Sequence, residues 1–453
     1  MNLLIQNGRV VDPSQDLDAG LDVLITDGVV AQVGTSVRAP KGTEVFDASG
    51  CVVSPGFIDL HTHLREPGHE HKETIRTGTR AAVAGGYTAV CAMANTIPPN
   101  DERAVTEMIV AESRRNGLCR VYPVGAVSKG LAGEALAELG DLRYAGCVAV
   151  SDDGMPIANA QLMRRALEYT KMLGIPVVVH EEEPSLCVDG VMHEGYYSTI
   201  LGMKGIPAVA EETMTWRDAF LARLTGGHVH IAHLSTSGAA DAVRHAKKKG
   251  WRVTCEVAPH HFTLTDEEVR SFSTSLKMKP PLRSKEHVDA ILEAIADGTV
   301  DAIATDHAPH HADEKDVEFD LAPFGIIGLE TAFAISYDRL VKAGVVELSR
   351  LIDLLSCGPA RTFGLPGGTL TKGSLGDVSI VDLNGSSKFE EFVSMASNSP
   401  FKGRAFSGRV VATVVGGDVR WHNTAAKPRP GAKKTSSADD GNSGIRKKGS
   451  RKK

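Results

Sequence analysis

The sequence predicts an α/β protein, a (β/α)8 barrel of the TIM type with a small β-sandwich domain built from both chain termini. Two observations predict it. Short strands punctuated by turn residues fill the first 54 residues and return after residue 366. Between them, apolar runs alternate with stretches of helical spacing, which indicates parallel strands joined by helices. We therefore assign 1–54 and 366–425 to the small domain, 55–365 to the barrel and 426–453 to a tail.

The N-terminal segment has the pattern of a meander. Its expected strands are 3–5, 9–11, 22–26, 29–33 and 44–47. Asn7-Gly8 and Asp27-Gly28 are hairpin signals because these residue types tolerate positive φ. Near the other end, strands are expected at 377–382 and 409–421, with a turn at Gly416-Gly417. Because so short a meander buries little apolar surface alone, the two terminal segments are expected to pair.

The central segment contains eight apolar runs, the number of strands that a closed barrel requires. These runs lie at 56–61, 87–93, 120–124, 147–151, 176–180, 229–233, 252–256 and 301–305. The segments 159–173, 212–225 and 239–249, which separate some of them, have the apolar spacing of helices. An open doubly wound sheet is the alternative. No Gly-rich phosphate fingerprint follows the first strand, which argues against a nucleotide-binding version of that alternative.

The composition is that of an ordinary globular protein. A net charge of -6 gives no reason to expect nucleic acid as the main partner. Seven cysteines without CxxC spacing argue against a disulfide framework and favour a reducing cytoplasm. We expect no secretory signal and no membrane span. The polar tail 426–453 is expected to be disordered; its basic runs could contact nucleic acid or an acidic partner, but a solvated tail is favoured.

Polar side chains follow five of the expected strands, at the end where a barrel of this type has its active site. They are His61 and His63, Asp152 and Asp153, His180, His233, and Asp306 and His307. His61 and His63 are two residues apart on one strand, so they project from the same face. Asp152 and Asp153 point to opposite faces, and alternation leaves open which of them faces the site. Five strand ends that finish in His or Asp predict one shared site.

Nitrogen and carboxylate ligands without thiolates are typical of a catalytic zinc centre. The number of groups favours two zinc ions that share a bridging carboxylate, with one ion as the alternative. Bound zinc lowers the pKa of its water to about 7, so the inferred chemistry is metal-assisted attack on a carbonyl. Six other histidines are interpreted as structural, solvated or bordering the site, without a metal role. These are His69, His71, His228, His230, His260 and His261.

Several stretches of the chain resemble the amidohydrolase superfamily, and within it the dihydroorotase family of the class I type. The resemblance runs from residue 8 to the C-terminal strands and excludes the tail. Its most specific motifs are 55–68 and 304–310, found together, and 151–154 and 255–261 match as well. The resemblance implies the reversible interconversion of N-carbamoyl-L-aspartate and dihydroorotate in pyrimidine synthesis.

The resemblance also implies roles for individual residues. The implied zinc ligands are His61, His63, His180, His233, Asp153 as the bridging carboxylate, and Asp306, which also carries the proton. Many relatives bridge their metals with a carboxylated lysine, but no Lys lies between Lys129 and Lys171 here, which separates the chain from typical hydantoinases and allantoinases. The positions that match substrate-binding residues are His63, Arg65, Asn95, His310, Phe324 and Gly325.

One position departs from the family pattern. Asn is usual before the Pro-Pro-Leu-Arg motif, whereas this chain has Lys279 there. A cation that only donates hydrogen bonds has replaced an amide that donates and accepts them. Lys279 therefore either meets an anionic substrate or has lost the role of that position. A milder change is Ala94, where Pro is usual before Asn95.

Two alternatives to a dihydroorotase follow from the same residues. The first is another cyclic amidase, such as a hydantoinase or an allantoinase, because these share the His-X-His opening. The second is a catalytically silent homologue that acts as a scaffold for aspartate transcarbamoylase; the intact set of implied ligands argues against it. We expect a small-molecule substrate, a homo-oligomer that is a dimer, and aspartate transcarbamoylase as a candidate partner.

Overall fold

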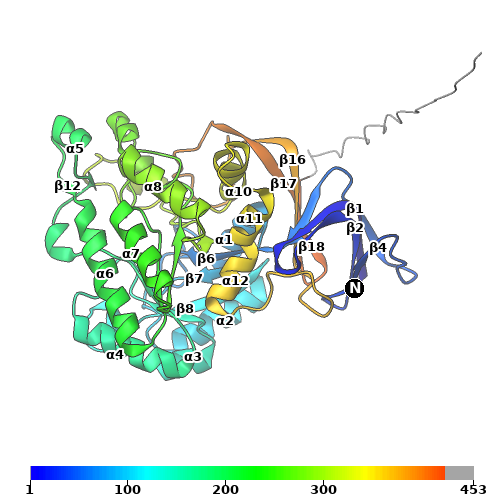
Figure 1. Ribbon diagram of the computed structural model, residues 1–453, viewed down its shortest axis with the longest axis horizontal. Coiled ribbons are helices and arrows are strands. Elements are labelled where there is room, and N and C mark those ends of the chain that lie inside the picture. Colours follow the sequence, from blue (N-terminus) through cyan, green and yellow to red (C-terminus); the bar gives the residue numbers. More distant parts are fainter. Residues whose placement is uncertain (1, 424–453) are drawn as a thin grey trace, which may run out of the picture.

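The computed structural model describes residues 2–423, so the predicted disordered tail 426–453 lies outside the described residues. Eight parallel strands form the central sheet (Figure 1). They are β6 (Phe57–Thr62), β7 (Tyr87–Ala92), β8 (Arg120–Gly125), β9 (Ala149–Ser151), β10 (Val177–Val179), β13 (Val229–Ile231), β14 (Val253–Val257) and β15 (Ala302–Ile303). Each corresponds to one of the eight runs predicted from the sequence.

The sheet closes on itself. Its strands lie side by side in sequence order from β6 to β15, and a parallel bridge between Thr62 of β6 and His307, which follows β15, joins the two ends of the sheet. The backbone N–H of His63 also donates to the carbonyl oxygen of His307, at 2.8 Å. Closure of this kind distinguishes a barrel from the open doubly wound sheet. The barrel prediction is therefore confirmed.

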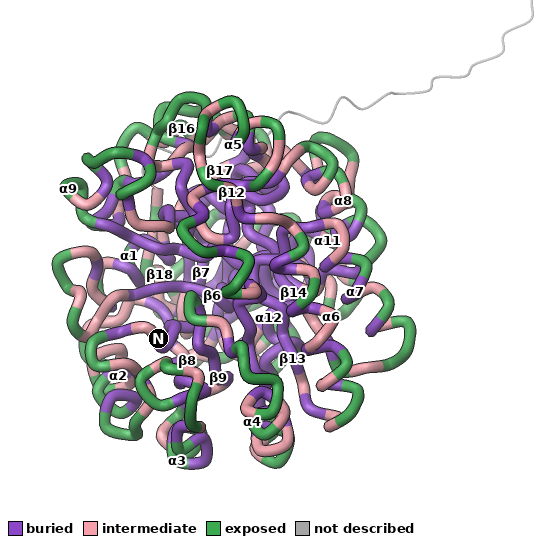
Figure 2. Tube along the Cα trace, turned by 90° about the vertical axis from the view of Figure 1, so that its left-hand side faces the viewer, coloured by how far each residue is buried: buried purple, intermediate pink, exposed green. Residues whose placement is uncertain are grey.

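Helices surround the barrel. They are α1 (Ile75–Ala84), α2 (Arg103–Asn116), α3 (Leu139–Ala145), α4 (Ala160–Leu173), α5 (Tyr196–Leu201), α6 (Ala208–Thr225), α7 (Ser237–Lys248), α8 (Lys285–Ala296), α9 (Ala312–Lys315), α10 (Ala332–Ser336), α11 (Leu348–Ile352) and α12 (Gly358–Phe363). The Asn159 side chain caps α4 by accepting from the first turn, and Gly174, with a φ of 68°, ends it. Figure 2 shows buried strands at the centre and exposed segments around them. No helix within residues 2–423 combines the length and apolar character that a bilayer crossing requires.

Strands from both ends of the chain share a second sheet, at the right of Figure 1. They are β1 (Asn2–Asp12), β2 (Leu17–Thr26), β3 (Val29–Gly34), β4 (Glu44–Asp47), β5 (Val52–Pro55), β16 (Val378–Lys388), β17 (Ala405–Val415) and β18 (Asp418–His422). The predicted pairing of the termini is confirmed, because β16 pairs with β5. The Arg120 guanidinium of the barrel binds Asp377 beside β16 with two hydrogen bonds, at 2.8 and 3.1 Å.

The turn predictions for this sheet had mixed outcomes. Asp27-Gly28 joins β2 to β3, and Gly416-Gly417 joins β17 to β18, as predicted. Asn7-Gly8 does not form a hairpin, because both residues lie inside β1, where the register against β2 shifts. Asn7 has a φ of 63° and its backbone N–H donates to Asp22. The dipeptide thus uses its tolerance of positive φ to form a bulge instead of a turn.

Candidate metal centre

His61 is the second-last residue of β6, and its ring has a fixed orientation. Its Nδ1 lies 3.0 Å from Glu256 Oε1, and the other carboxylate oxygen lies 3.1 Å from His230 Nε2. All three side chains are fully or almost fully buried. Because a carboxylate only accepts hydrogen bonds, Nδ1 of His61 carries the proton and Nε2 keeps its lone pair. The lone pair of His61 is therefore available to a metal.

His63 is oriented in the same way by a different acceptor. Its Nδ1 lies 2.8 Å from Asn95 Oδ1, and its Nε2 lies 3.1 Å from Asp306 Oδ1. Asn95, which the resemblance implies in substrate binding, thus contacts an expected ligand directly. Asp306 has a φ of 48°, a backbone conformation that is rare outside glycine and that clusters at functional sites.

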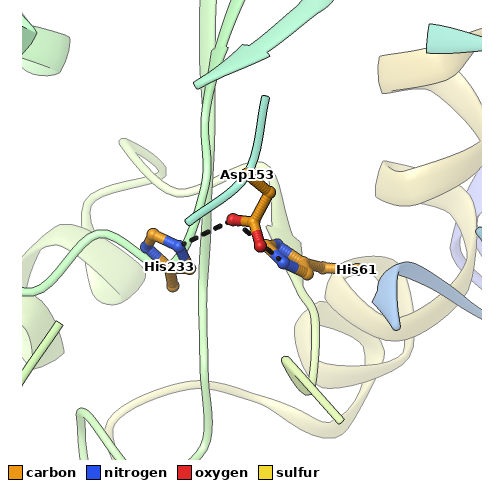
Figure 3. Close-up of side chains that lie close together, drawn as sticks. All are labelled: His61, Asp153 and His233. Carbon is orange, nitrogen blue, oxygen red and sulfur yellow. Dashed lines mark ion pairs between the residues drawn. The ribbon is translucent and has the colours of Figure 1, made fainter. Parts of the chain in front are cut away.

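Asp153 lies at the centre of the histidines. Its Oδ1 is 3.4 Å from His61 Nε2, 3.6 Å from His180 Nδ1 and 3.5 Å from His233 Nε2, and its Oδ2 is 3.5 Å from His63 Nε2. Figure 3 shows this carboxylate between the rings of His61 and His233. The four histidines come from three strand ends. Asp153 therefore stands where a carboxylate could bridge two ions.

Asp152 faces the other way. Its Oδ1 accepts hydrogen bonds from the backbone N–H groups of Val127 and Ser128, at 2.8 and 3.0 Å. Asp152 thus stabilises the loop that follows β8, and its hydrogen bonds point away from the histidine cluster. Of the two neighbouring carboxylates, Asp153 is therefore the one that faces the histidines.

The donor set fits a metal cation. Nε2 of His61 and Oδ1 of Asp153 are buried atoms without a hydrogen-bond partner in the described part of the chain. Two groups of three side chains bring their ligand atoms within 4.8 Å of one another, His61 with Asp153 and His233, and His61 with His63 and Asp306. Imidazole and carboxylate donors of this kind suit zinc. The predicted strand ends thus meet in one cluster.

The electrostatics of the cluster also favour a bound cation. Burial lowers the pKa of His61, but the Asp153 carboxylate overrides it and leaves that pKa well above its ordinary value. Burial raises the pKa of Asp153, yet the charge of His61 overrides it and holds the pKa well below its ordinary range. Positive charge is thus strongly favoured inside this buried space. A metal cation can take the place of those protons.

One wall of the site combines Arg65 with the loop that follows β15. Arg65 Nε donates to the carbonyl of Pro309 at 3.1 Å, and a terminal nitrogen lies 3.4 Å from His310 Nε2. His310 Nε2 lies 2.9 Å from the carbonyl oxygen of Phe324. Gly325 has a φ of 125°, and a Cβ there would lie 2.7 Å from the Cβ of Ala308. The structure therefore brings the expected substrate-binding residues of this wall together.

Lys279, the position that departs from the family pattern, contacts Glu182. Its Nζ lies 2.6 Å from Glu182 Oε1 and 5.6 Å from the ring centroid of Phe324. The other oxygen of Glu182 lies 4.0 Å from His180 Nε2. Lys279 thus lies beside Phe324 and, through Glu182, close to the expected ligand His180.

Sequence reasoning missed Glu256 and Glu182. Both signals were present, because a carboxylate within a buried strand needs a partner, and Glu182 follows His180 at the spacing of one strand face. His230, interpreted from the sequence as structural, contacts Glu256 with its Nε2. His260 and His261 are buried beside one another, and His261 Nε2 lies 3.0 Å from the carbonyl oxygen of Pro280.

The chain matches known proteins along most of its length. The dihydro-orotase-like family matches residues 50–239. A curated relative from Citrifermentans bemidjiense, named Dihydroorotase, is 54% identical over 421 residues, which cover 92% of this chain and 99% of that protein. The chain belongs to the dihydroorotase family. A second family member, from Pelobacter propionicus, is 53% identical with the same coverage.

Solved structures support the fold of this dihydroorotase-family chain. An L-hydantoinase (dihydropyrimidinase) from Arthrobacter aurescens has a TM-score of 0.83 at 24% identity, covering 92% of this chain and 95% of that one. A D-hydantoinase (dihydropyrimidinase) from Thermus sp. has a TM-score of 0.76 at 26% identity, covering 92% and 94%. The likeness extends over the barrel and the second sheet together.

Proposed function

We propose that this protein is a dihydroorotase that reversibly cyclises N-carbamoyl-L-aspartate to dihydroorotate in pyrimidine biosynthesis. The observation that carries the proposal is the likeness to curated dihydroorotases at more than half identity over 92% of the chain. The buried cluster around Asp153, with Arg65 and His310 at its edge, supports it independently. The chemistry required is addition of water to a cyclic amide and its reverse.

The residues of the chain divide the work of this reaction. Zinc, when bound by His61, His63, Asp153, His180, His233 and Asp306, would polarise the amide carbonyl and activate water. Asp306 takes the proton of the attacking water and returns it to the ring nitrogen that departs. The Arg65 guanidinium grips the substrate carboxylate with two parallel hydrogen bonds, which Asn95, His310 and the backbone of Phe324 and Gly325 complement.

Further features belong to the same proposal. Two zinc ions per subunit are favoured over one, because Asp153 contacts all four histidines. The enzyme works in the cytoplasm, in keeping with seven buried free thiols. It forms a homodimer, and aspartate transcarbamoylase is a candidate partner. Gel filtration with light scattering, with and without added aspartate transcarbamoylase, tests both points of assembly.

The test of the function compares substrates on one purified sample. We expect turnover of carbamoyl-aspartate and dihydroorotate that far exceeds turnover of hydantoin or allantoin, together with bound zinc. His61→Ala should lose activity and metal together. Turnover of hydantoin alone would identify a hydantoinase instead, which the structural neighbours make the nearest rival. Full activity in metal-free protein, or zinc without turnover of any of these substrates, would contradict the proposal.

A further inference from the structure

Lys279 forms an ion pair whose other half is buried. The Glu182 side chain is only 7% exposed, whereas that of Lys279 is 27% exposed. A buried carboxylate without a cationic partner is strongly disfavoured, so the contact at 2.6 Å stabilises Glu182 as an anion in this position. An Asn at this position, which the family pattern carries, would provide no positive charge for Glu182.

Glu182 lies behind the ring of His180. Its Oε2 is 4.0 Å from His180 Nε2, and that nitrogen is buried without a hydrogen-bond partner in the described part of the chain. The opposite nitrogen, Nδ1, faces Asp153 at 3.6 Å and His233 at 3.0 Å. The carboxylate is therefore on the side of the ring that points away from the cluster.

Two of the other rings have a hydrogen-bond acceptor on the side that points away from the cluster. Glu256 accepts from the outward nitrogen of His61, and Asn95 Oδ1 lies 2.8 Å from the outward nitrogen of His63. Acceptors of this kind fix which nitrogen faces a metal and raise its basicity. Glu182 stands on the corresponding side of the His180 ring, at 4.0 Å, which is longer than a hydrogen bond. It is the carboxylate nearest to that nitrogen among the ion pairs of residues 2–423, and it depends on a residue from a different part of the chain.

We propose that Lys279 is a positioning residue of the metal centre: its ammonium holds the Glu182 carboxylate behind His180, and His180 thereby presents Nδ1 to the metal. The inference rests on the proposed function, because the metal centre is part of it. Lys279 acts through Glu182: within residues 2–423 its ion pair is with Glu182 and not with an expected metal ligand. It also offsets the negative charge of Glu182 at the edge of a site that receives an anionic substrate.

The test measures zinc affinity in the full-length protein, by competition with a chromophoric chelator. Lys279→Met keeps the length of the side chain and removes its charge, and should weaken one zinc site by about 10- to 100-fold. Lys279→Arg keeps the charge and should restore most of the affinity. Lys285→Met is the matched control, because Lys285 pairs with Asp289 on the exposed face of α8. This control should leave zinc affinity and activity unchanged.

A double variant tests the route through Glu182. Glu182→Gln should weaken zinc about as much as Lys279→Met, and the two changes together should cost no more than Glu182→Gln alone, because coupled residues are not additive. With excess zinc, kcat should recover in each variant. If Lys279→Met fails to fold, the zinc affinity of Glu182→Gln still tests whether Glu182 supports the metal centre.

Two outcomes would overturn the inference. One is native zinc affinity in Lys279→Met or Glu182→Gln, and the other is additive losses in the double variant. Either result would leave the proposed function intact as long as the unaltered protein binds zinc and cyclises carbamoyl-aspartate. Failure of the unaltered protein in both assays would instead contradict the proposed function.

Discussion

Replacing Glu256 tests the metal centre most sharply, because it changes the surroundings of an expected ligand without replacing the ligand itself. Its carboxylate accepts from His61 at 3.0 Å and lies 3.1 Å from His230 Nε2. Burial alone would raise the pKa of Glu256, but the hydrogen bonds from His230 and His61 lower it to about 2. Glu256→Leu fills a similar volume and removes both acceptors. The His61 ring then loses the partner that keeps its proton on Nδ1.

The magnitude follows from the groups left behind. A buried N–H donor without an acceptor costs about 1–3 kcal/mol, and about 1.4 kcal/mol corresponds to tenfold in affinity. We therefore expect zinc affinity to fall by about 10- to 100-fold in Glu256→Leu. Glu256→Gln should be milder, about tenfold or less, because its oxygen can serve His61 while His230 changes tautomer against the Thr254 hydroxyl, 2.8 Å away.

Chelator competition on both variants, with circular dichroism to confirm folding, measures this prediction. Glu267→Gln is a matched control, because Glu267 pairs with Arg270 on the surface. We expect zinc affinity to be highest in the unaltered protein, lower in Glu256→Gln and lowest in Glu256→Leu. A folded Glu256→Leu protein with native zinc affinity would refute the argument that Glu256 orients His61.

Three further predictions concern other parts of the molecule. Asp153→Asn should lose zinc and activity, whereas Asp152→Asn should keep zinc and lower the free energy of unfolding by about 1–3 kcal/mol. Metal analysis and chemical denaturation of both variants measure these effects. Equal loss of zinc in the two variants would contradict the view that Asp153 faces the metal and Asp152 does not. Arg65→Lys should raise KM for dihydroorotate about tenfold or more, because a single ammonium replaces a guanidinium that forms two parallel hydrogen bonds with the carboxylate. An unchanged KM in steady-state kinetics would show that Arg65 does not bind the substrate carboxylate. Burial raises the pKa of Glu330 from 4.5 to about 7. The stability that its protonated form contributes, up to about 3 kcal/mol, is complete below pH 4.5 and is lost as the pH rises through 7. Glu330→Gln should flatten the unfolding free energy across that range, and an unchanged pH profile would contradict this.

Much of the fold and part of the candidate site were predictable from local pattern. All eight barrel strands were located, because a strand buried on both faces is a short apolar run whatever surrounds it. The strand ends predicted His61, His180 and Asp306 as candidate residues for a related reason, since polar residues that follow buried strands meet at one face of a barrel. Asn7-Gly8 was misjudged because a hairpin and a bulge require the same positive φ, and only the neighbouring strand decides between them.

The sequence by itself determined which side chains could reach the mouth of the barrel, because alternation and strand order are local properties of the chain. Only the tertiary structure decided how they are used. It turned Asp153 inward and Asp152 towards Val127, paired Glu256 with His61 across 195 residues, and tied Lys279 to Glu182. These choices depend on distances between segments that are remote in sequence, and on the need of each buried charge for a partner, which no local pattern contains.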